Sequence, residues 1–324
     1  MDHNLLEIKD LYVQYTADGR AVEAVNGITI TVKKGDTLGL VGETGAGKTT
    51  TALAIMGLVP DPPGKVTSGE ILLNGENLLQ KSAKDMRTIR GKDIAMIFQD
   101  PMTSLNPVLP VGDQIREVIL LHEKLSKAEA THKACQMLEL VGIPAERYDE
   151  YPHQFSGGMK QRVIIAIALA CNPKLLIADE PTTALDVTIQ AQVLEMMRDL
   201  KEKYGTAMIL ITHDLGVVAE VCNNVAIMYA GQIVESGTLD DIYSAPQHPY
   251  TIGLFRSIPD LTSKQRRLEI IPGIMPDPSN LPKGCNFCTR CQYATERCKQ
   301  EKPPVAQLSK SHAVLCWRNA EQEA

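Results

Sequence analysis

The stretch of sequence that decides the fold reads Gly42-Glu43-Thr44-Gly45-Ala46-Gly47-Lys48-Thr49. An apolar run at 38–41 precedes it and a helix-compatible run at 50–58 follows it, which is the strand, loop and helix context of a phosphate-binding loop. Glycines let successive backbone N–H groups curl around phosphates, and the following helix directs the positive end of its dipole at them. We therefore predict a nucleotide site that extends from Gly42 to Thr50.

Four further positions predict what this loop does. Lys48 would reach the β- and γ-phosphates, and the Thr49 hydroxyl would bind magnesium. The apolar run at 175–178 delivers Asp179 and Glu180 to the carboxyl end of a strand, where open α/β sheets bind ligands. Asp179 would complete the magnesium shell, and Glu180 would orient or polarise the attacking water. An isolated Asp-Glu pair is usually just solvated, but this pair follows a phosphate loop.

The wider pattern predicts an α/β fold. Short apolar runs alternate with longer helical patterns, which is typical of a mainly parallel sheet covered by helices. The expected strands are 38–41, 94–98, 175–179, 208–212 and 225–228. The clearest helix follows Asp186 and ends near Gly205. Nearer the N-terminus, residues 28–32 alternate between apolar and polar side chains, as a half-exposed antiparallel strand does. The stretch at about 101–171 is mostly helical in pattern.

Composition limits the function classes. The chain has 324 residues, 44% apolar content and a net charge of -6, which disfavours a general nucleic-acid binder. Its longest apolar run, 163–171, has nine residues, about half of the roughly 20 that cross a bilayer. The first residues show no signal-peptide pattern. We expect a protein that stays in the cytoplasm and does not cross the membrane itself.

The last part of the chain has a different character. After about residue 246, prolines break it into short pieces, and five of the eight cysteines lie in the last forty residues. Clustered thiolates in a reducing compartment are more often metal ligands than disulfides. The spacing of Cys285, Cys288 and Cys291 occurs in iron–sulfur runs, while four thiolates suit structural zinc equally well. Free cysteines in a loose tail are the remaining alternative.

A second anion-binding motif gives the chain its family resemblance. The run is Phe155-Ser156-Gly157-Gly158-Met159-Lys160-Gln161-Arg162, in which Ser156 and the glycines would open a helix with free N–H groups. It resembles the signature motif of the ABC ATPases, with Met159 where many members have glutamine. The resemblance covers about residues 4–247. It implies that two ATPase subunits stack head to tail, so that Ser156, Gly157, Gly158 and Met159 act on the ATP bound by the partner.

The same resemblance assigns roles to four more residues. Gln99 matches a glutamine that senses magnesium and the nucleophilic water, and His213 matches a histidine that touches the γ-phosphate and positions Glu180. Asp186, in Ala184-Leu185-Asp186, matches the loop through which the two subunits communicate. Tyr15 lies where an aromatic ring stacks on adenine, although Tyr12 is close enough to confuse the register. Thr49, Gln99 and Asp179 are the implied magnesium ligands.

The tail points to one branch of the family. His248-Pro249-Tyr250-Thr251 and Pro282-Lys283-Gly284-Cys285 are similar to the C-terminal extension of oligopeptide and dipeptide importer ATPases, with nickel importers as close relatives. This branch resemblance marks four cysteines as ligands of a 4Fe-4S cluster, with Cys288 as the extra one and zinc as the alternative. The implied ligands are Cys285, Cys291, Cys298 and Cys316.

Together these readings predict an organisation and a role. We expect a P-loop NTPase core of the ABC type at 1–247, with an antiparallel β subdomain and a helical subdomain at about 101–171, and a small cysteine-rich extension at 248–324. The resemblance implies a magnesium-dependent ATPase, a translocase subunit that energises peptide uptake from the cytoplasmic face of the membrane. Its expected partners are a related second ATPase chain, two membrane-spanning permease subunits and an extracytoplasmic substrate-binding protein, with no nucleic acid. The alternatives are a nickel or metal-chelate importer and a soluble ABC ATPase acting on nucleic acid or ribosomes.

Overall fold

The computed structural model describes residues 4–17, 19–99, 104–183, 185–257 and 270–320. The chain divides into two compact units, each made of several segments. The first contains residues 1–5, 32–37 and 73–211, and the second contains 6–31, 38–72 and 212–324. The C-terminal extension therefore belongs to the same unit as the phosphate loop.

Three parallel strands form the sheet of the first unit. They are β6 (Ile94–Ile97), β7 (Leu175–Asp179) and β8 (Ala207–Thr212), with β7 in the middle. Every residue of β7 is buried, as a strand covered on both faces requires. These three strands confirm the predicted runs to within one residue at each end. The minor elements of this unit are β5 (Glu76–Asn77), η1 (Leu78–Gln80) and α2 (Ala83–Ile89).

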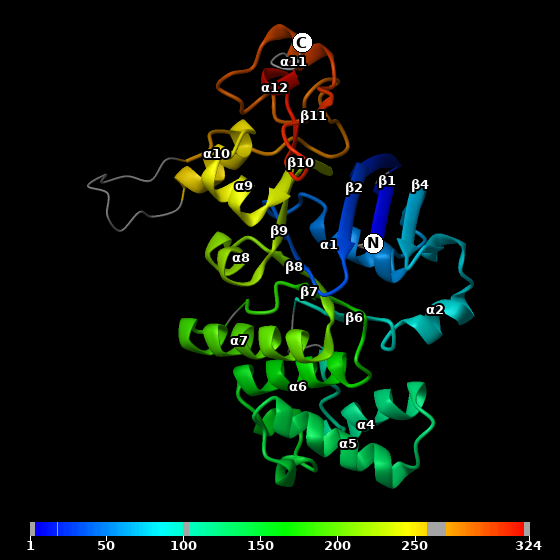
Figure 1. Ribbon diagram of the computed structural model, residues 1–324. Coiled ribbons are helices and arrows are strands. Elements are labelled where there is room, and N and C mark those ends of the chain that lie inside the picture. The colour runs from blue at the N-terminus through cyan, green and yellow to red at the C-terminus, as the bar shows by residue number, and fades with distance from the viewer. Residues whose placement is uncertain (1–3, 18, 100–103, 184, 258–269, 321–324) are drawn as a thin grey trace. The chain divides into compact units, whose positions relative to one another are not determined.

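Helices make up the rest of the first unit. The helical stretch holds α4 (Val111–His122), α5 (Lys127–Leu140), η2 (Ala145–Arg147), η3 (Pro152–Gln154) and α6 (Gly157–Leu169), and α7 (Val187–Tyr204) follows β7. Figure 1 shows α4 and α5 packed beside α6, which also contacts α7. The predicted α7 is confirmed at both ends, because Asp186 caps its start and Gly205, at φ 65°, ends it in the left-handed conformation.

Two sets of strands build the second unit. In one, β1 (Asn4–Ala17) lies between β2 (Arg20–Lys33) and β4 (Gly64–Leu73). The connection between β1 and β2 is so short that they must run antiparallel, and β2 is far longer than the predicted 28–32. In the other, β3 (Thr37–Val41) pairs in parallel with β9 (Asn224–Tyr229), which pairs antiparallel with β10 (Gln232–Thr238). The helices of this region are α1 (Lys48–Met56), α8 (Leu215–Val221) and α9 (Leu239–Ser244).

The C-terminal extension continues the second of these strand sets. Its elements are α10 (Pro249–Arg256), α11 (Glu296–Gln300), β11 (Val305–Gln307), β12 (Ala313–Leu315) and α12 (Trp317–Ala320). β12 pairs antiparallel with β10, and β11 pairs with β12. Tyr250 and Phe287 are buried against Tyr229 of β9, with ring centroids 4.6 and 5.1 Å from the Tyr229 ring. Apolar packing thus anchors a segment that prolines break into short pieces.

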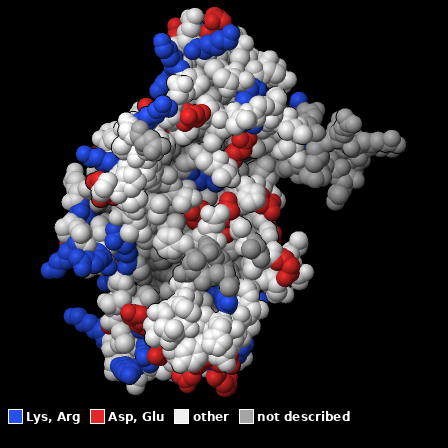
Figure 2. Space-filling model, turned by 180° about the vertical axis from the view of Figure 1, so that it is seen from behind, with Lys and Arg blue, Asp and Glu red and all other residues white. Residues whose placement is uncertain are grey.

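Charge and hydropathy complete the description. On the face that Figure 2 shows, basic and acidic side chains both occur, and they adjoin one another in several places. Within the described residues, no helix has the length and apolar character needed to cross a membrane.

Candidate functional site: a phosphate loop and a second helix start

The predicted phosphate loop connects β3 to α1 in the second unit. Gly47 begins the helix at φ 104°, a conformation that only glycine adopts without strain. A Cβ at Gly47 would lie 2.4 Å from the carbonyl oxygen of Ala24, so the position excludes every other residue on two counts. The loop's backbone geometry is therefore specified by its sequence, as predicted.

Lys48 is held inside this loop. Its Nζ donates to the carbonyl oxygens of Gly42 at 2.7 Å and of Glu43 at 3.0 Å, and only 7% of the residue is exposed. An ammonium group carries three N–H donors, and two of them are used on these carbonyls. The lysine is thus anchored within the phosphate loop.

A neighbouring turn is hydrogen-bonded to the phosphate loop. The N–H of Gly231 donates to the carbonyl oxygen of Ala46 at 2.9 Å, and the N–H of Asn26 donates to the carbonyl oxygen of Gly231 at 2.8 Å. The turn contains Ala230 at φ 44°, which is a strained value for a residue with a Cβ. Strain of this kind persists only where surrounding contacts fix the backbone, and the sequence analysis missed this turn.

The acidic pair lies in the first unit, at the carboxyl end of β7. Asp179 is 2% exposed. Glu180 adopts φ 47°, and its N–H donates to the carbonyl oxygen of Ile211 at 2.9 Å. A non-glycine residue in the left-handed region is uncommon and concentrates at functional sites. The backbone therefore holds Glu180 in an orientation that an ordinary strand end would not give it.

Two side chains fix the carboxylate of Glu180. Gln99 donates from Nε2 and Thr183 donates from Oγ1 to the same oxygen, Oε2, each at 3.0 Å. The structure thus brings together two of the residues singled out in the sequence, Gln99 and Glu180. Thr183 was missed, although its place three residues after Glu180 in a turn is where a threonine hydroxyl returns to a local acceptor.

The signature motif begins α6 as predicted. The Oγ of Ser156 accepts from the N–H of Met159 at 3.4 Å, which caps the helix start. A Cβ on Gly158 would lie 2.6 Å from Cγ2 of Ile189 on α7, whereas a Cβ on Gly157 would meet nothing within 4 Å. The Sδ of Met159 accepts from Arg147 at 3.3 Å. One face of this helix start is closed by α7, and among the described residues the Gly157 side is open.

The remaining predicted residues take the following places. His213 is exposed immediately after β8, and Asp186 caps α7 by accepting from the N–H of Ile189 at 3.0 Å. Ala184 lies outside the described residues. The Tyr15 ring adjoins Gly64, the first residue of β4, whereas Tyr12 packs over Gly27 of β2. Of the two tyrosines, Tyr15 is the one beside the segment that follows the phosphate helix.

The five clustered cysteines are neighbours but form no closed metal site. Within the described residues, no group of three or more Cys, His, Asp or Glu side chains has the arrangement that holds a metal ion. Burial raises the pKa of Cys285 to about 12, partly offset by an N–H bond from Phe287, and the thiols of Cys316, Cys288 and Cys298 are close enough to raise it further. Without a metal, this environment favours protonated thiols.

The thiols differ in the backbone groups that they face. Burial also raises the pKa values of Cys291 and Cys316, and the backbone N–H groups of Tyr293 and Arg318 offset part of these two rises. The N–H of Phe287 has the same effect on the pKa of Cys285, and the N–H of Thr289 lowers the pKa of Cys288. The Sγ of Cys298 lies 3.4 Å from Oγ1 of Thr295. Hydrogen bonds to sulfur are the contacts that tune thiolate ligands.

Comparison with known proteins places this geometry in a family. The family described as "ABC transporter" matches residues 25–183, and the family described as "Oligopeptide/dipeptide transporter, C-terminal region" matches residues 234–298. The chain is 55% identical over 316 residues to the oligopeptide transport ATP-binding protein OppD of Bacillus subtilis, covering 97% of this chain and 88% of that one. It is 48% identical to the dipeptide transport ATP-binding protein DppD of Escherichia coli, covering 96% of each.

Solved structures agree with the fold. The dimeric ATP-binding cassette MJ0796, in a post-hydrolysis state with ADP and Pi, is similar with a TM-score of 0.65 and 25% identity over 72% of this chain and 98% of that one. CbiO1 of Clostridium perfringens, part of the transporter complex cbiONQ, gives a TM-score of 0.65 and 27% identity over 78% and 96% of the two chains. The phosphate loop, the capped signature helix and near-complete relatives lead to one conclusion. This chain belongs to the family of ABC transporter ATP-binding proteins of the oligopeptide and dipeptide type.

Proposed function

We propose that this protein binds and hydrolyses ATP to energise the import of peptides. The observation that carries the proposal is the Glu180 carboxylate, held at the end of β7 by Gln99 and Thr183 in a strained backbone conformation. A carboxylate fixed by two donors is oriented for one task, and in a nucleoside triphosphatase that task is to position or polarise the attacking water.

The other residues of the two units take complementary roles. Lys48 would bind the β- and γ-phosphates, and Thr49, Gln99 and Asp179 would hold magnesium, whose charge would offset that of the phosphates. His213 would touch the γ-phosphate and position Glu180, and Tyr15 would stack on adenine. Each role follows from the chemistry of the side chain and from its place after a strand or in the phosphate loop.

The signature helix start indicates a second ATPase subunit. Its open side at Gly157 has no partner group within 4 Å in the described chain, and the N-terminus of a 13-residue helix attracts anions. We infer that Ser156, Gly157, Gly158 and Met159 bind the γ-phosphate of ATP held by a related partner chain, and that Asp186 lies in the contact between the two subunits. ATP binding would then close the pair and hydrolysis would reopen it.

The cargo follows from the relatives. The relatives reported above are named oligopeptide and dipeptide transport ATP-binding proteins, so we propose peptides as the transported class and a nickel or other metal chelate as the alternative. The partners would be two membrane-spanning permeases and an extracytoplasmic substrate-binding protein. The ATPase would work as a peripheral subunit on the cytoplasmic face of the membrane.

For the extension we propose a 4Fe-4S cluster on Cys285, Cys291, Cys298 and Cys316. For three of these thiols the backbone N–H that offsets part of the rise in pKa belongs to the residue two positions later, whereas for Cys288 such an N–H belongs to Thr289, one position later. When bound, such a cluster would replace four thiol protons by metal bonds and so tie together four points of the extension. Zinc on the same thiolates is the alternative.

The ATPase role can be tested at Glu180. In the assembled transporter, Glu180→Gln should keep ATP binding and lower turnover by about a hundredfold or more, since it keeps the shape of the side chain and removes the base. Glu195→Gln, which neutralises an exposed acid on α7, is the matched control and should leave both quantities unchanged. Undiminished turnover by the Glu180 variant would exclude this carboxylate from the chemistry.

The cluster can be tested by chemical analysis. Anaerobically purified protein should contain iron and acid-labile sulfide in equal amounts, and Cys291→Ser should lose both while Cys135→Ser, at a half-buried position on α5, retains them. Stoichiometric zinc without sulfide would replace the cluster by a zinc site.

A further inference from the structure

The C-terminal extension makes two direct contacts with a single residue of the phosphate loop. Arg290 Nη1 lies 2.9 Å from Oε2 of Glu43, and the Oη of Tyr250 accepts from the N–H of Glu43 at 3.0 Å. The Arg290 side chain is 5% exposed and that of Glu43 is 32% exposed. Side chain and backbone of Glu43 are therefore both held by residues more than two hundred positions away in the sequence.

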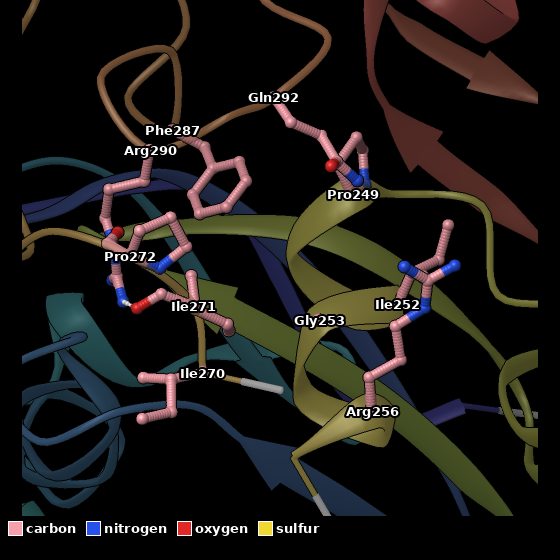
Figure 3. A pocket seen from close by; sticks show the side chains of 10 residues that line it. All are labelled: Pro249, Ile252, Gly253, Arg256, Ile270, Ile271, Pro272, Phe287, Arg290 and Gln292. Atoms are coloured by element: carbon pink, nitrogen blue, oxygen red, sulfur yellow. Dashed lines mark hydrogen bonds between the residues drawn. The ribbon is translucent and has the colours of Figure 1, made fainter. Parts of the chain in front are cut away.

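Arg290 is itself fixed from several sides. Its Nε donates to the carbonyl oxygen of Pro272 at 3.0 Å, and its Nη2 donates to that of Ile271 at 3.3 Å. Figure 3 shows its side chain directed at this segment, at the edge of a cavity of about 120 Å³. The guanidinium also lies over the rings of Tyr229 and Phe287. A planar donor set satisfied in this way has one orientation, so Arg290 acts as a rigid support.

Tyr250 is equally constrained. It is fully buried, and its ring packs between Tyr229 and Phe287 at centroid distances of 4.6 and 5.5 Å. Its Oη therefore presents an acceptor to the loop at a fixed point. Burial raises the pKa of Tyr250 above its ordinary value, so the hydroxyl stays neutral.

The extension supports the opposite side of the loop as well. Asn286, which is 3% exposed, donates from Nδ2 to the carbonyl oxygen of Ala230 at 2.9 Å. Ala230 belongs to the turn whose Gly231 N–H binds the carbonyl oxygen of Ala46. The extension thus holds both ends of the stretch from Glu43 to Ala46, directly at one end and through this turn at the other.

The contact with Arg290 offsets the negative charge of Glu43 in the phosphate loop. The loop has to bind a highly charged anion, yet it carries a carboxylate at Glu43, one residue after the glycine whose carbonyl binds Lys48. An unpaired carboxylate there would repel the phosphates and compete for Lys48, since like charges at short range are costly where water is partly excluded. Arg290 neutralises it, and the carbonyl oxygen of Glu43 remains available to orient Lys48.

We propose that Arg290 and Tyr250 are positioning residues for the phosphate loop, and that the C-terminal extension thereby sets the affinity of the loop for nucleotide. The inference rests on the proposed ATP-binding function. It assigns to the extension a role in the nucleotide site that is independent of whether its cysteines carry a metal. ATP affinity, more than the rate of the chemical step, depends on these two residues.

A double-mutant cycle on the full-length protein in its assembled transporter tests this. Arg290→Met should raise the Kd of a fluorescent MgATP analogue about tenfold and leave turnover at saturating ATP within about twofold of wild type. Adding Glu43→Gln to Arg290→Met removes the unpaired carboxylate, so the double variant should recover most of the lost affinity. A residue that only stabilised the fold would show no such rescue.

Two further variants complete the design. Tyr250→Phe keeps the ring and removes the acceptor, and should raise Kd about threefold. Lys302→Met removes one positive charge from an exposed site of the extension and should bind like wild type. Equal affinity of the Arg290→Met and wild-type proteins, or failure of Glu43→Gln to restore binding, would overturn the inference. Failure of the wild-type protein to bind MgATP would instead overturn the proposed function itself.

Discussion

Two helix starts in this molecule are proposed to bind phosphate, and they are built differently. The helix α1 begins at Gly47 in the left-handed conformation without a side-chain cap, and the loop before it is bound by Lys48, by a neighbouring turn and by the C-terminal extension. The helix α6 begins at Ser156 in an extended conformation with a serine cap, and the glycine after the cap has open space. The first helix start is fixed by many contacts and the second by few.

Under the proposed function, the difference follows from the separate task of each helix start. A loop that binds a nucleotide within its own chain gains affinity when its N–H groups are oriented before binding, because little entropy is then lost. A helix start that acts on a nucleotide in another subunit needs an uncovered surface, and it acquires its remaining contacts when the subunits meet. The following predictions test this contrast, from the largest expected effect to the smallest.

The largest effect is expected at Gly47. Gly47→Ala places a Cβ 2.4 Å from the carbonyl oxygen of Ala24 at a backbone φ of 104°. Strain of this kind costs about 1–3 kcal/mol, and relieving it would move the N–H groups that bind phosphate. We expect nucleotide affinity to fall about tenfold or more, measured by fluorescent-nucleotide titration.

Gly35→Ala is the control for that experiment. Gly35 also has a positive φ, 73°, but a Cβ there would meet nothing within 4 Å. It should lower the stability of the protein without changing nucleotide affinity. Retention of wild-type affinity by Gly47→Ala would show that the loop adapts, and the contrast between the two helix starts would not hold.

A smaller effect is expected at the two signature glycines, and the loss of stability should differ between them. Gly158→Ala brings a Cβ to 2.6 Å from Cγ2 of Ile189, which should destabilise the folded chain by about 1 kcal/mol in chemical denaturation. Gly157→Ala has room in the chain and should leave stability within about 0.5 kcal/mol of wild type. Turnover of the assembled transporter should nevertheless fall in both. Normal turnover with Gly157→Ala would mean that no partner nucleotide approaches this surface.

The smallest effect concerns the pH dependence of the support for the phosphate loop. Burial lowers the pKa of His248 to about 3, and its Nδ1 accepts from the N–H of Tyr250 at the start of α10. The unfolded histidine titrates at an ordinary value of about 6.5, so the unfolded state binds the proton first as the pH falls. Stability is fully present above that value and declines below it, toward pH 3.

This predicts a loss of about 1 kcal/mol of unfolding free energy between pH 7 and 5.5, which chemical denaturation would measure. His248→Asn keeps an acceptor for the Tyr250 N–H and does not titrate, so its stability should decline less over the same interval. An identical decline in both proteins would assign the pH dependence to other groups.

The sequence predicted those parts of the molecule whose physics is local. A serine or aspartate cap and a buried apolar strand are each specified by a few neighbouring residues, and Ser156, Asp186 and β7 were all identified correctly, whereas α1 begins two residues before the predicted run at 50–58. Glu180 was placed at its strand end, although the positive φ that orients it was not foreseen. Thr183 donates a hydrogen bond to Oε2 of Glu180. A threonine three residues after an acid is too common a pattern to predict such a bond.

Contacts between segments far apart in the chain could not be predicted from the sequence. Arg290 and Glu43 are 247 positions apart, and His312 and Glu235 are 77 apart; neither pair forms a recognisable motif. The strands β11 and β12 have three residues each, too few for an alternating pattern to register. The sequence analysis therefore predicted the extension by its cysteines and prolines and missed its pairing with β10.

The pairing of β12 with β10 has a consequence for the integrity of the protein. It covers the outer edge of β10, and His312 binds the carboxylate of Glu235, which is 1% exposed. A chain cut before residue 248 would leave that ladder of N–H and C=O groups open to pairing with other molecules, next to a buried acid that keeps the Gln247 N–H but loses its contacts with His248 and His312. The extension thus covers a strand edge, and we expect shortened versions of this ATPase to self-associate more readily than the full chain.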